Sequence, residues 1–230
     1  MMTVPILYED ENVLLADKPA GMLSEASDTQ PSVITALSSH GEEGFLAPVT
    51  RLDKGVSGVI LLAKNKKSAA FLSALVQDKT KMQKEYLAII SGRMEEKKGT
   101  LRDLLFKDSA KNKTYVVQRV RRGVKEAILH YEVLQEATVA GKALSLVSVR
   151  LETGRTHQIR VQFASRKHAL VGDGRYGGDT DFPLGLLAYR LSFCLPNGKR
   201  VFAESGRVGD LPFSFFSLSN AVKEDEKTAL

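Results

Sequence analysis

The sequence has one cysteine, no tryptophan and four histidines among its 230 residues. A single cysteine, Cys194, excludes an internal disulfide framework and fits the reducing cytoplasm, where we expect the protein to be located. Its surroundings, RLSFCL, predict a buried apolar thiol rather than a nucleophile. No pair of cysteines or histidines has the spacing of a zinc site, and neither a Walker-type phosphate loop nor a Rossmann fingerprint is present. We therefore expect neither a metal nor another cofactor.

Long apolar runs are also absent. None approaches the roughly 20 residues that a helix needs to cross a bilayer, and the N-terminus shows no basic segment followed by an apolar one. We therefore expect no membrane association and no secretory signal. The chain is long enough to bury a substantial core, and no linker of distinctive composition divides it. We predict one domain over residues 1–218 and a polar C-terminal tail over 219–230.

Positive charge is in excess, with a formal net charge of +6 and a pI of about 9.3. The basic residues gather in two belts. The first belt contains Lys64, Lys66, Lys67, Lys79, Lys81 and Lys84, and the second contains Lys107, Lys111, Lys113, Arg119, Arg121, Arg122 and Lys125. A run of charge is usually a solvated face, but two belts around a candidate site favour a polyanionic partner such as nucleic acid.

Short apolar segments with turn residues between them predict more strands than helices. We expect strands in 6–18, 59–65, 84–92, 113–120, 126–134 and 143–152, and a hairpin of 186–195 with 199–204. Helical spacing is present in 32–41, in 67–79 and in 155–167, where Thr156 is the expected N-cap. This pattern predicts an α+β fold, a largely antiparallel mixed sheet flanked by helices.

Asp53 occupies a loop at the start of an apolar strand, in the stretch RLDKGVSG. Most loop aspartates are turn residues or caps. Here, however, Gly55 and Gly58 permit close approach by another chain. A carboxylate beside a cation stays ionised, and an ionised carboxylate can act as a nucleophile or a base. Asp53 is therefore a candidate catalytic residue.

Two other stretches are weak signals when taken alone. TGRTHQIR, residues 153–160, carries Arg155 and Arg160 and could grip a phosphate or a carboxylate. Tyr86, in the strand KEYLA, would by itself be a core residue more often than a catalytic one.

Taken together, these stretches resemble the ordered motifs of the RluA-type family of pseudouridine synthases. The resemblance rests on RLDKGVSGVILLAKN, KEYLAIISG and LETGRTHQIRVQFASRKHALVGDGRYG, with ILYEDENVLLADKPAGML before them and LLAYRLSF after them. It covers about residues 6–205 in family order, and chance agreement of so many spaced motifs is remote. The family implies the pseudouridine synthase fold with a central catalytic cleft. It also implies an isomerase that acts on uridine in ribosomal or transfer RNA.

The resemblance assigns roles to individual residues. Asp53 matches the essential aspartate, Tyr86 the tyrosine that stacks on the target base, and Arg160 the basic residue that pairs with the aspartate. Leu186 matches an apolar residue of the pocket, and Arg51 matches an arginine that contacts RNA. The remaining substrate-binding candidates of the same motifs are Lys54, Arg155, His157 and Gln158.

The sequence departs from the family pattern at three positions. Thr50 and Leu187 stand where many members have histidine, and Val56 stands where threonine is common. These departures bear on the choice of substrate more than on the reaction. The S4-like RNA-binding module of some relatives has no counterpart here, so we expect the catalytic domain to find its RNA largely unaided. We also expect a monomer.

The implied reaction breaks the C1′–N1 bond of a uridine that has flipped out of its stack, and rejoins the uracil through C5. Asp53 could attack C1′ or take a proton from C2′, and the sequence fits both routes. Two other functions fit these residues less well. A non-catalytic RNA-binding or assembly-chaperone protein would not need Asp53, Tyr86 and Arg160 together. A glycoside hydrolase would need a second carboxylate facing the first, where these motifs offer cations.

Overall fold

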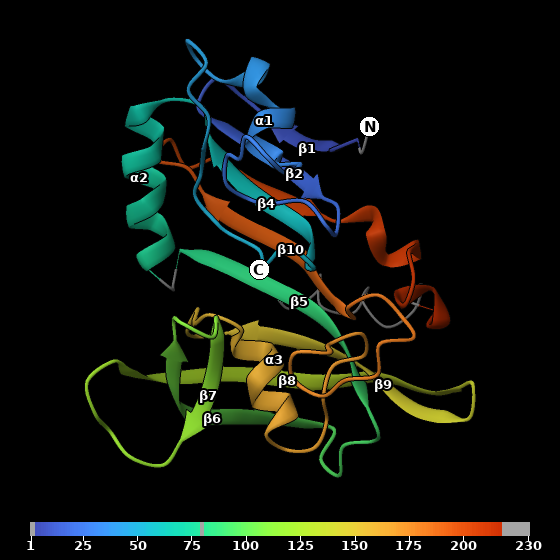
Figure 1. Cartoon of the computed structure of the whole chain (residues 1–230). Helices are drawn as coiled ribbons and strands as arrows, with labels where there is room; N and C mark the ends of the chain where they lie inside the picture. The colour runs from blue at the N-terminus through green and yellow to red at the C-terminus, as the bar shows by residue number, and fades with distance from the viewer. Residues whose placement is uncertain (1–2, 79–80, 218–230) are drawn as a thin grey trace. The chain divides into compact units, whose positions relative to one another are not determined.

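The computed structural model describes residues 3–78 and 81–217, and the chain divides into two compact units (Figure 1). The first unit comprises residues 1–86 and 187–207, and the second comprises 87–186 and 208–230. Strands β5 (Met82–Ser91) and β10 (Leu186–Cys194) contain two of the points where the chain passes between units, and the 3₁₀ turn η2 (Gly206–Gly209) contains the third. The single domain over residues 1–218 stays a prediction, and the tail at 219–230 lies outside the described residues. No helix in the described ranges is long and apolar enough to cross a membrane.

The first unit contains a mixed sheet in the order β1-β2-β4-β10, with β3 on β4 and β11 on β10. Only the pairing of β4 with β10 is parallel among the register pairs of this unit's described residues. The strands other than β10 are β1 (Ile6–Glu9), β2 (Val13–Lys18), β3 (Ala47–Pro48), β4 (Ser57–Ala63) and β11 (Arg200–Glu204). The predicted largely antiparallel mixed sheet is confirmed.

Both faces of this sheet are covered, because successive side chains of a strand point to opposite sides. Val13 and Leu15 face a cluster that includes Leu72 and Leu75 of helix α2 (Lys66–Gln77). Leu14 and Ala16, also on β2, face the opposite cluster, which holds helix α1 (Val33–Ala36). A 3₁₀ turn, η1 (Ser38–His40), follows α1, and η2 (Gly206–Gly209) follows β11. The helices predicted at 32–41 and 67–79 are confirmed.

Gly58 brings two strands of this chain close together, whereas the predicted close approach by another chain at Gly55 and Gly58 stays a prediction. The φ of Gly58 is +116°, and a Cβ atom built there would lie 2.2 Å from the carbonyl oxygen of Ala188 on β10. Any side chain at this position would therefore force β4 and β10 apart. The glycine thus fixes the end of β4 that follows the Asp53 loop.

The second unit contains an antiparallel sheet in the order β9-β8-β6-β7. Its strands are β6 (Lys98–Asp108), β7 (Lys113–Val117), β8 (Val124–Val139) and β9 (Lys142–Leu151). Helix α3 (Gln158–Ala164) packs on β6 and β7 (Figure 1), where Val161 joins a core with Leu105 and Ala127. A 3₁₀ turn, η3 (Phe213–Phe215), lies near the end of the described chain.

Three local expectations need correction. Strand β6 was not predicted, because its buried Leu101 and Leu105 are four residues apart, a helical spacing, and β-branched residues are scarce in it. Cys194 is exposed rather than buried, because it ends β10 on the outward side of the alternating pattern. The N-cap of α3 is His157 rather than Thr156.

Candidate active site

Asp53 lies half-buried on a loop whose neighbouring peptides are held from both sides. Ser24 Oγ donates to the carbonyl oxygen of Leu52 at 2.8 Å and accepts from the Leu52 amide at 3.0 Å. On the other side, the carbonyl oxygen of Lys54 accepts from the Gly21 amide at 2.7 Å. A turn follows, in which the amide of Val56 donates to the carbonyl oxygen of Asp53 at 3.0 Å. These bonds fix the backbone that carries the carboxylate.

Lys18 is the main residue of this region that the sequence analysis missed. Its side chain is fully buried, and its Nζ donates to the carbonyl oxygens of Pro19 at 3.1 Å, Met22 at 2.8 Å and Lys54 at 3.3 Å. Burial lowers the pKa of Lys18 to about 8, and the nearby charge of Asp53 opposes this shift. The sequence signal was the Lys-Pro-x-Gly turn at residues 18–21, in which no role was predicted for the lysine. Lys18 joins the Pro19–Met22 turn to the Asp53 loop.

Tyr86 lies on the part of β5 that belongs to the first unit, and the structure places it within electrostatic range of Asp53. Burial, with a smaller contribution from the charge of Asp53, raises the pKa of Tyr86 to about 12. The phenol is therefore neutral at physiological pH and retains its proton. Asp53, Tyr86 and Lys18 thus form one charge-coupled group within the first unit.

Arg160 lies on α3 in the second unit, where it is held by an aspartate that the sequence analysis did not identify. Its Nε donates to Asp173 Oδ2 and its Nη2 to Asp173 Oδ1, both at 2.7 Å. The Asp173 side chain is completely buried, and the guanidinium carbon lies 5.3 Å from the centre of the Tyr176 ring. This bidentate geometry sets the plane of the guanidinium group. The pairing of Arg160 with Asp53 stays a prediction.

His157 begins α3 in the left-handed region, with φ of 55°. Such a conformation is uncommon for residues other than glycine, although histidine, like asparagine and aspartate, adopts it more often than most. The Tyr176 hydroxyl contacts His157 Nδ1 at 2.9 Å and accepts from the amide of Thr114 at 2.9 Å. Thr156 does not cap the helix. Its carbonyl oxygen accepts a hydrogen bond from Thr114 Oγ1 at 2.9 Å. Tyr176 therefore contacts both Arg160 and His157, and it is a second residue that the sequence analysis overlooked.

Residues 12–165 match the sequence profile of the RNA pseudouridylate synthase family. The chain belongs to this family. Membership in the predicted RluA-type group agrees with a 35% identity over 182 residues to ribosomal large subunit pseudouridine synthase D of Zymomonas mobilis, which covers 75% of this chain and 55% of that protein.

Other curated relatives carry similar names. The uncharacterized RNA pseudouridine synthase YhcT of Bacillus subtilis is 38% identical over 179 residues, 75% of this chain and 57% of the relative. The uncharacterized RNA pseudouridine synthase Mb1567 of Mycobacterium bovis is 34% identical over 226 residues, 90% of this chain and 70% of the relative. The chain spans about three-fifths of the length of the B. subtilis relatives that it matches.

A solved structure supports the fold. Human RNA pseudouridylate synthase domain containing 1 superposes with a TM-score of 0.74 at 23% identity, and the match covers 88% of this chain and 83% of that one. Identity at this level concerns the fold alone, and it confirms the predicted α+β pseudouridine synthase fold.

The predicted RNA-contacting cations of this family member lie in exposed or partly exposed positions. Arg51 Nη1 is 2.9 Å from Glu25 Oε1, and Lys54 Nζ donates to Gln30 Oε1 at 2.9 Å. In the second unit, Arg155 Nε donates to the carbonyl oxygen of Glu126 at 2.9 Å. An exposed ion pair such as Arg51–Glu25 contributes little to stability. Contact of these three side chains with RNA stays a prediction.

Gln158 is buried, and its amide holds the start of α3. Its Oε1 accepts from Thr153 Oγ1 at 2.8 Å and from the Arg155 amide at 3.0 Å, while its Nε2 donates to the carbonyl oxygen of Ile128 at 3.1 Å. These bonds give Gln158 a structural role, and its contact with substrate stays a prediction. Leu186 is also buried, as expected for an apolar pocket residue.

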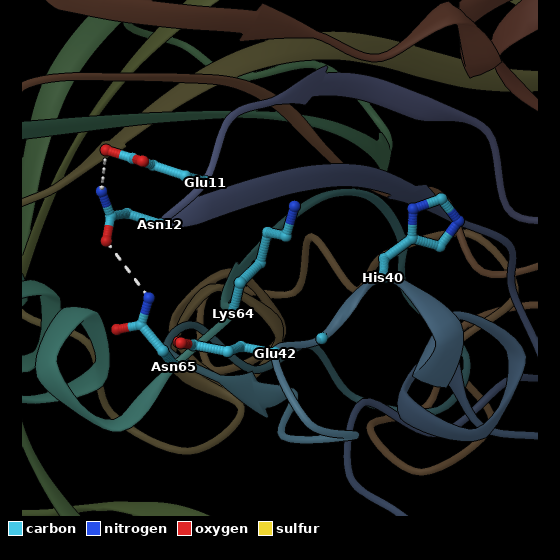
Figure 2. Close-up of a pocket in the computed structure, with 7 residues that line it drawn as sticks. Glu11, Asn12, His40, Glu42, Lys64 and Asn65 are labelled. Carbon is cyan, nitrogen blue, oxygen red and sulfur yellow. Dashed lines mark hydrogen bonds between the residues drawn. The ribbon is translucent and has the colours of Figure 1, made fainter.

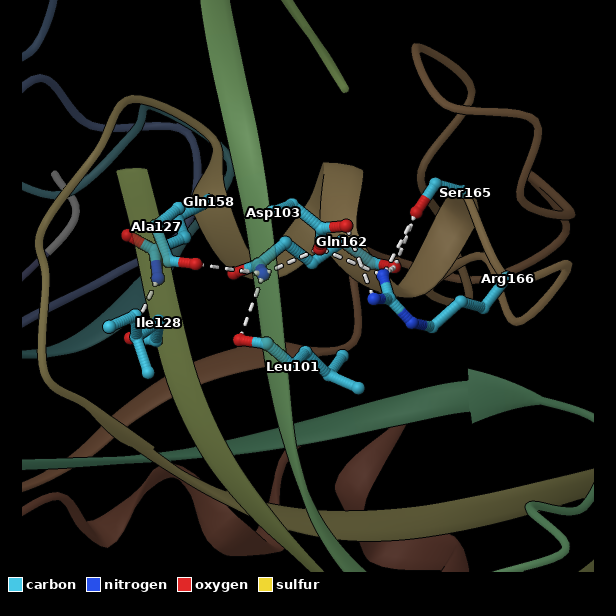
Figure 3. Close-up of polar contacts among 8 residues, drawn as sticks. All are labelled: Leu101, Asp103, Ala127, Ile128, Gln158, Gln162, Ser165 and Arg166. Atoms are coloured by element: carbon cyan, nitrogen blue, oxygen red, sulfur yellow. Dashed lines mark hydrogen bonds and ion pairs between the residues drawn. The ribbon is translucent and has the colours of Figure 1, made fainter. Parts of the chain in front are cut away.

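A further network anchors the remainder of α3 (Figure 3). Gln162 Nε2 donates to Asp103 Oδ2 at 2.8 Å and to the carbonyl oxygen of Leu101 at 3.2 Å. Arg166 Nη1 donates to the same Asp103 oxygen at 2.9 Å. The helix that carries Arg160 is therefore tied to β6 by the fully buried Gln162 and by the partly exposed Arg166. A buried polar group such as Gln162 is costly to leave without partners.

A pocket of about 410 Å³ opens elsewhere on the first unit (Figure 2). None of the predicted site residues lines it. Lys64 Nζ donates to Glu9 Oε1 at 2.7 Å, and Asn65 Nδ2 donates to Asn12 Oδ1 at 3.2 Å. Its polar groups thus bind one another, and we assign the pocket no part in the reaction. Within residues 3–78 and 81–217, no cluster of three or more His, Cys, Asp or Glu side chains has an arrangement that could hold a metal ion.

Proposed function

We propose that this chain is an isomerase that converts uridine in ribosomal or transfer RNA to pseudouridine. The observation that carries the proposal is the group around Asp53. Asp53, on a loop held by backbone hydrogen bonds, lies within electrostatic range of the buried ammonium group of Lys18 and of the neutral side chain of Tyr86. Membership in the RNA pseudouridylate synthase family supports the same reaction.

The reaction needs only groups that this chain supplies. The C1′–N1 bond of the uridine breaks, the uracil turns while it stays bound, and a C1′–C5 bond forms. C5 loses its hydrogen as a proton and N1 gains one, so the composition is unchanged and no electrons are transferred. A carboxylate, a proton donor or acceptor and a surface for the uracil are sufficient.

Each group has a role in the proposed reaction. The Asp53 carboxylate attacks C1′ or removes a proton from C2′. Tyr86 offers the flat face of its ring to the uracil, and its neutral hydroxyl can relay the C5 proton by accepting it while passing its own proton on. Arg160, with its guanidinium fixed by Asp173, supplies positive charge to the anionic carboxylate or substrate. We further propose that the protein acts as a monomer in the cytoplasm, which its free cysteine fits.

The test is tritium release from RNA that carries 5-tritiated uridine. The wild-type protein should release tritium, whereas Asp53→Asn should not, because an amide can neither attack C1′ nor accept a proton from C2′. Asp28→Asn makes the same change at an exposed aspartate of the first unit and should leave the rate unchanged. RNA that binds to the wild-type protein without any tritium release would favour the non-catalytic RNA-binding alternative.

Pseudouridine mapping of total RNA, from cells with and without the gene, identifies the substrate. The loss of one pseudouridine in ribosomal or transfer RNA would name both the RNA and the position. An unchanged map, together with no tritium release by the purified protein, would overturn the proposed function.

A further inference from the structure

The positive charge of the chain is concentrated in one segment of the second unit, residues 104–125, which we call the charged corner. Residues 104–125 contain seven lysines and arginines and one acidic residue, Asp108. The local excess is therefore +6, equal to the net charge of the whole chain. The remaining residues are balanced, so any long-range attraction for a polyanion originates mainly from this corner.

An aromatic pair lies at the centre of this corner. Phe106 on β6 and Tyr115 on β7 are direct partners in the antiparallel register, so both side chains stand on one face of the hairpin. The adjacent pair, Leu105 and Val116, points to the opposite face, where it joins the core under α3. The aromatic pair therefore stands on the face of the hairpin that points away from α3.

Cationic side chains lie over both rings. The guanidinium carbon of Arg121 is 4.7 Å from the centre of the Phe106 ring, and Lys113 Nζ is 5.8 Å from the centre of the Tyr115 ring. Tyr115 is 36% exposed, and Val120, which lies between Arg119 and Arg121 in the sequence, is 79% exposed. Arginine and aromatic rings both offer flat faces on which a base can stack.

We infer that these residues, Phe106, Lys113, Tyr115, Arg119 and Arg121, form a docking surface for an unpaired segment of the RNA substrate. The inference rests on the proposed function and adds a second contact beyond the reacting uridine. Positive charge alone would suit any RNA. The exposed ring of Tyr115 and the partly exposed ring of Phe106 lie among cations and fit unpaired bases, because the bases of a duplex are already stacked on one another. We call these five residues the hairpin surface.

Binding assays can separate stacking from charge. Fluorescence anisotropy would be measured with a labelled single-stranded oligouridylate and with an RNA duplex that has the same number of phosphates. Tyr115→Thr removes the ring and keeps a residue that favours strands. It should weaken binding of the single strand about tenfold, the size expected for one stacked base, and leave duplex binding unchanged. Tyr115→Phe should bind both RNAs as the wild type does.

Two further variants control for charge and for loss of an exposed ring. Arg119→Gln should weaken binding of both RNAs and make the dependence of affinity on salt shallower. Phe202→Thr removes a ring that is 52% exposed on β11 in the first unit, outside the charged corner, and should change neither affinity. Thermal unfolding shows whether each variant is folded. If Tyr115→Thr does not fold, Phe106→Leu is a second variant that removes a ring from the hairpin surface.

Two results would overturn the inference. One is wild-type affinity for the single strand in folded Tyr115→Thr or Phe106→Leu. The other is tighter binding of the duplex than of the single strand by the wild-type protein. Both results are independent of tritium release. If the protein isomerises uridine but its affinity for the single strand does not depend on Tyr115, only the hairpin surface is contradicted.

Discussion

The charge of Asp53 stabilises the ammonium form of the fully buried Lys18, and Lys18 donates to the carbonyl oxygen of the residue that follows Asp53. The relationship is reciprocal. The lysine holds the loop in place, and the carboxylate offsets part of the cost of burying the lysine. The Asp53 loop and the Lys-Pro-x-Gly turn therefore act as one structural element, although 35 residues separate Lys18 from Asp53.

We predict that Lys18→Met lowers turnover by at least an order of magnitude. The methionine fills similar space, but it donates no hydrogen bond, so the carbonyl oxygens of Pro19, Met22 and Lys54 lose a donor. Each buried carbonyl left without a partner costs about 1–3 kcal/mol, and the loss of a buried charge offsets part of this cost. Tritium release and thermal unfolding measure the two effects. Lys66→Met, at an exposed lysine of α2, should change neither.

The pH dependence of Lys18 provides a second prediction. Its folded-state pKa of about 8 lies below the ordinary 10.5. Between these values the unfolded chain binds more protons, so this lysine's contribution to stability grows as pH rises and is lost as pH falls through 8. We expect turnover to fall above pH 8 as the ammonium loses its proton, whereas the folded state gains stability from this group. Turnover that stays flat from pH 7 to about 9.5 in the folded protein would contradict this role.

Tyr86→Phe and Tyr86→Ala should behave differently. Phenylalanine keeps the face on which uracil stacks, and alanine removes it, so Tyr86→Ala should be inactive. If the neutral hydroxyl moves a proton, Tyr86→Phe should bind RNA normally but release tritium orders of magnitude more slowly. If only stacking matters, it should retain most of its activity. Two fully active variants would remove Tyr86 from the site.

Much of the fold was predictable because the sequence pattern was local. Neighbouring residues account for the short apolar run of β2, for the capping box of Asn65 and Ser68 at the start of α2, and for the hairpin of β10 and β11. Strand β6 was not predictable in this way. Its pairing with β7 and β8 overrides a sequence whose leucines have helical spacing.

The predicted site was incomplete for a related reason. Recognisable motifs contain the three predicted catalytic residues, Asp53, Tyr86 and Arg160. The residues that support them contact partners that are distant in sequence; these are Lys18, Asp173 and Tyr176. Arg160 and Asp173 are 13 residues apart, and only the fold makes them a bidentate pair. A short motif such as VGDGRYG does not show which of its polar residues turn inward, so these supporting residues emerge from the structure alone.

The last prediction concerns that pair. Asp173→Asn leaves the buried Arg160 without a full countercharge, and breaking a buried ion pair from one side costs about 3–5 kcal/mol. Asp103→Asn is the matched control, since Asp103 pairs with Arg166 at the other end of α3 and Arg166 is 33% exposed. We expect a smaller loss of stability in Asp103→Asn, and near wild-type turnover at temperatures where it remains folded.

The double variant Arg160→Met with Asp173→Leu distinguishes a catalytic arginine from a structural one. Replacing both partners of a buried ion pair with apolar side chains is often neutral or stabilising, so the double variant should recover most of the stability that Asp173→Asn loses. Tritium release should remain at the level of Arg160→Met, several orders of magnitude below wild type, because the positive charge is still absent. If the double variant were stable and active, the Arg160–Asp173 pair would serve only the fold, and the basic residue of the site would have to be sought elsewhere in the chain.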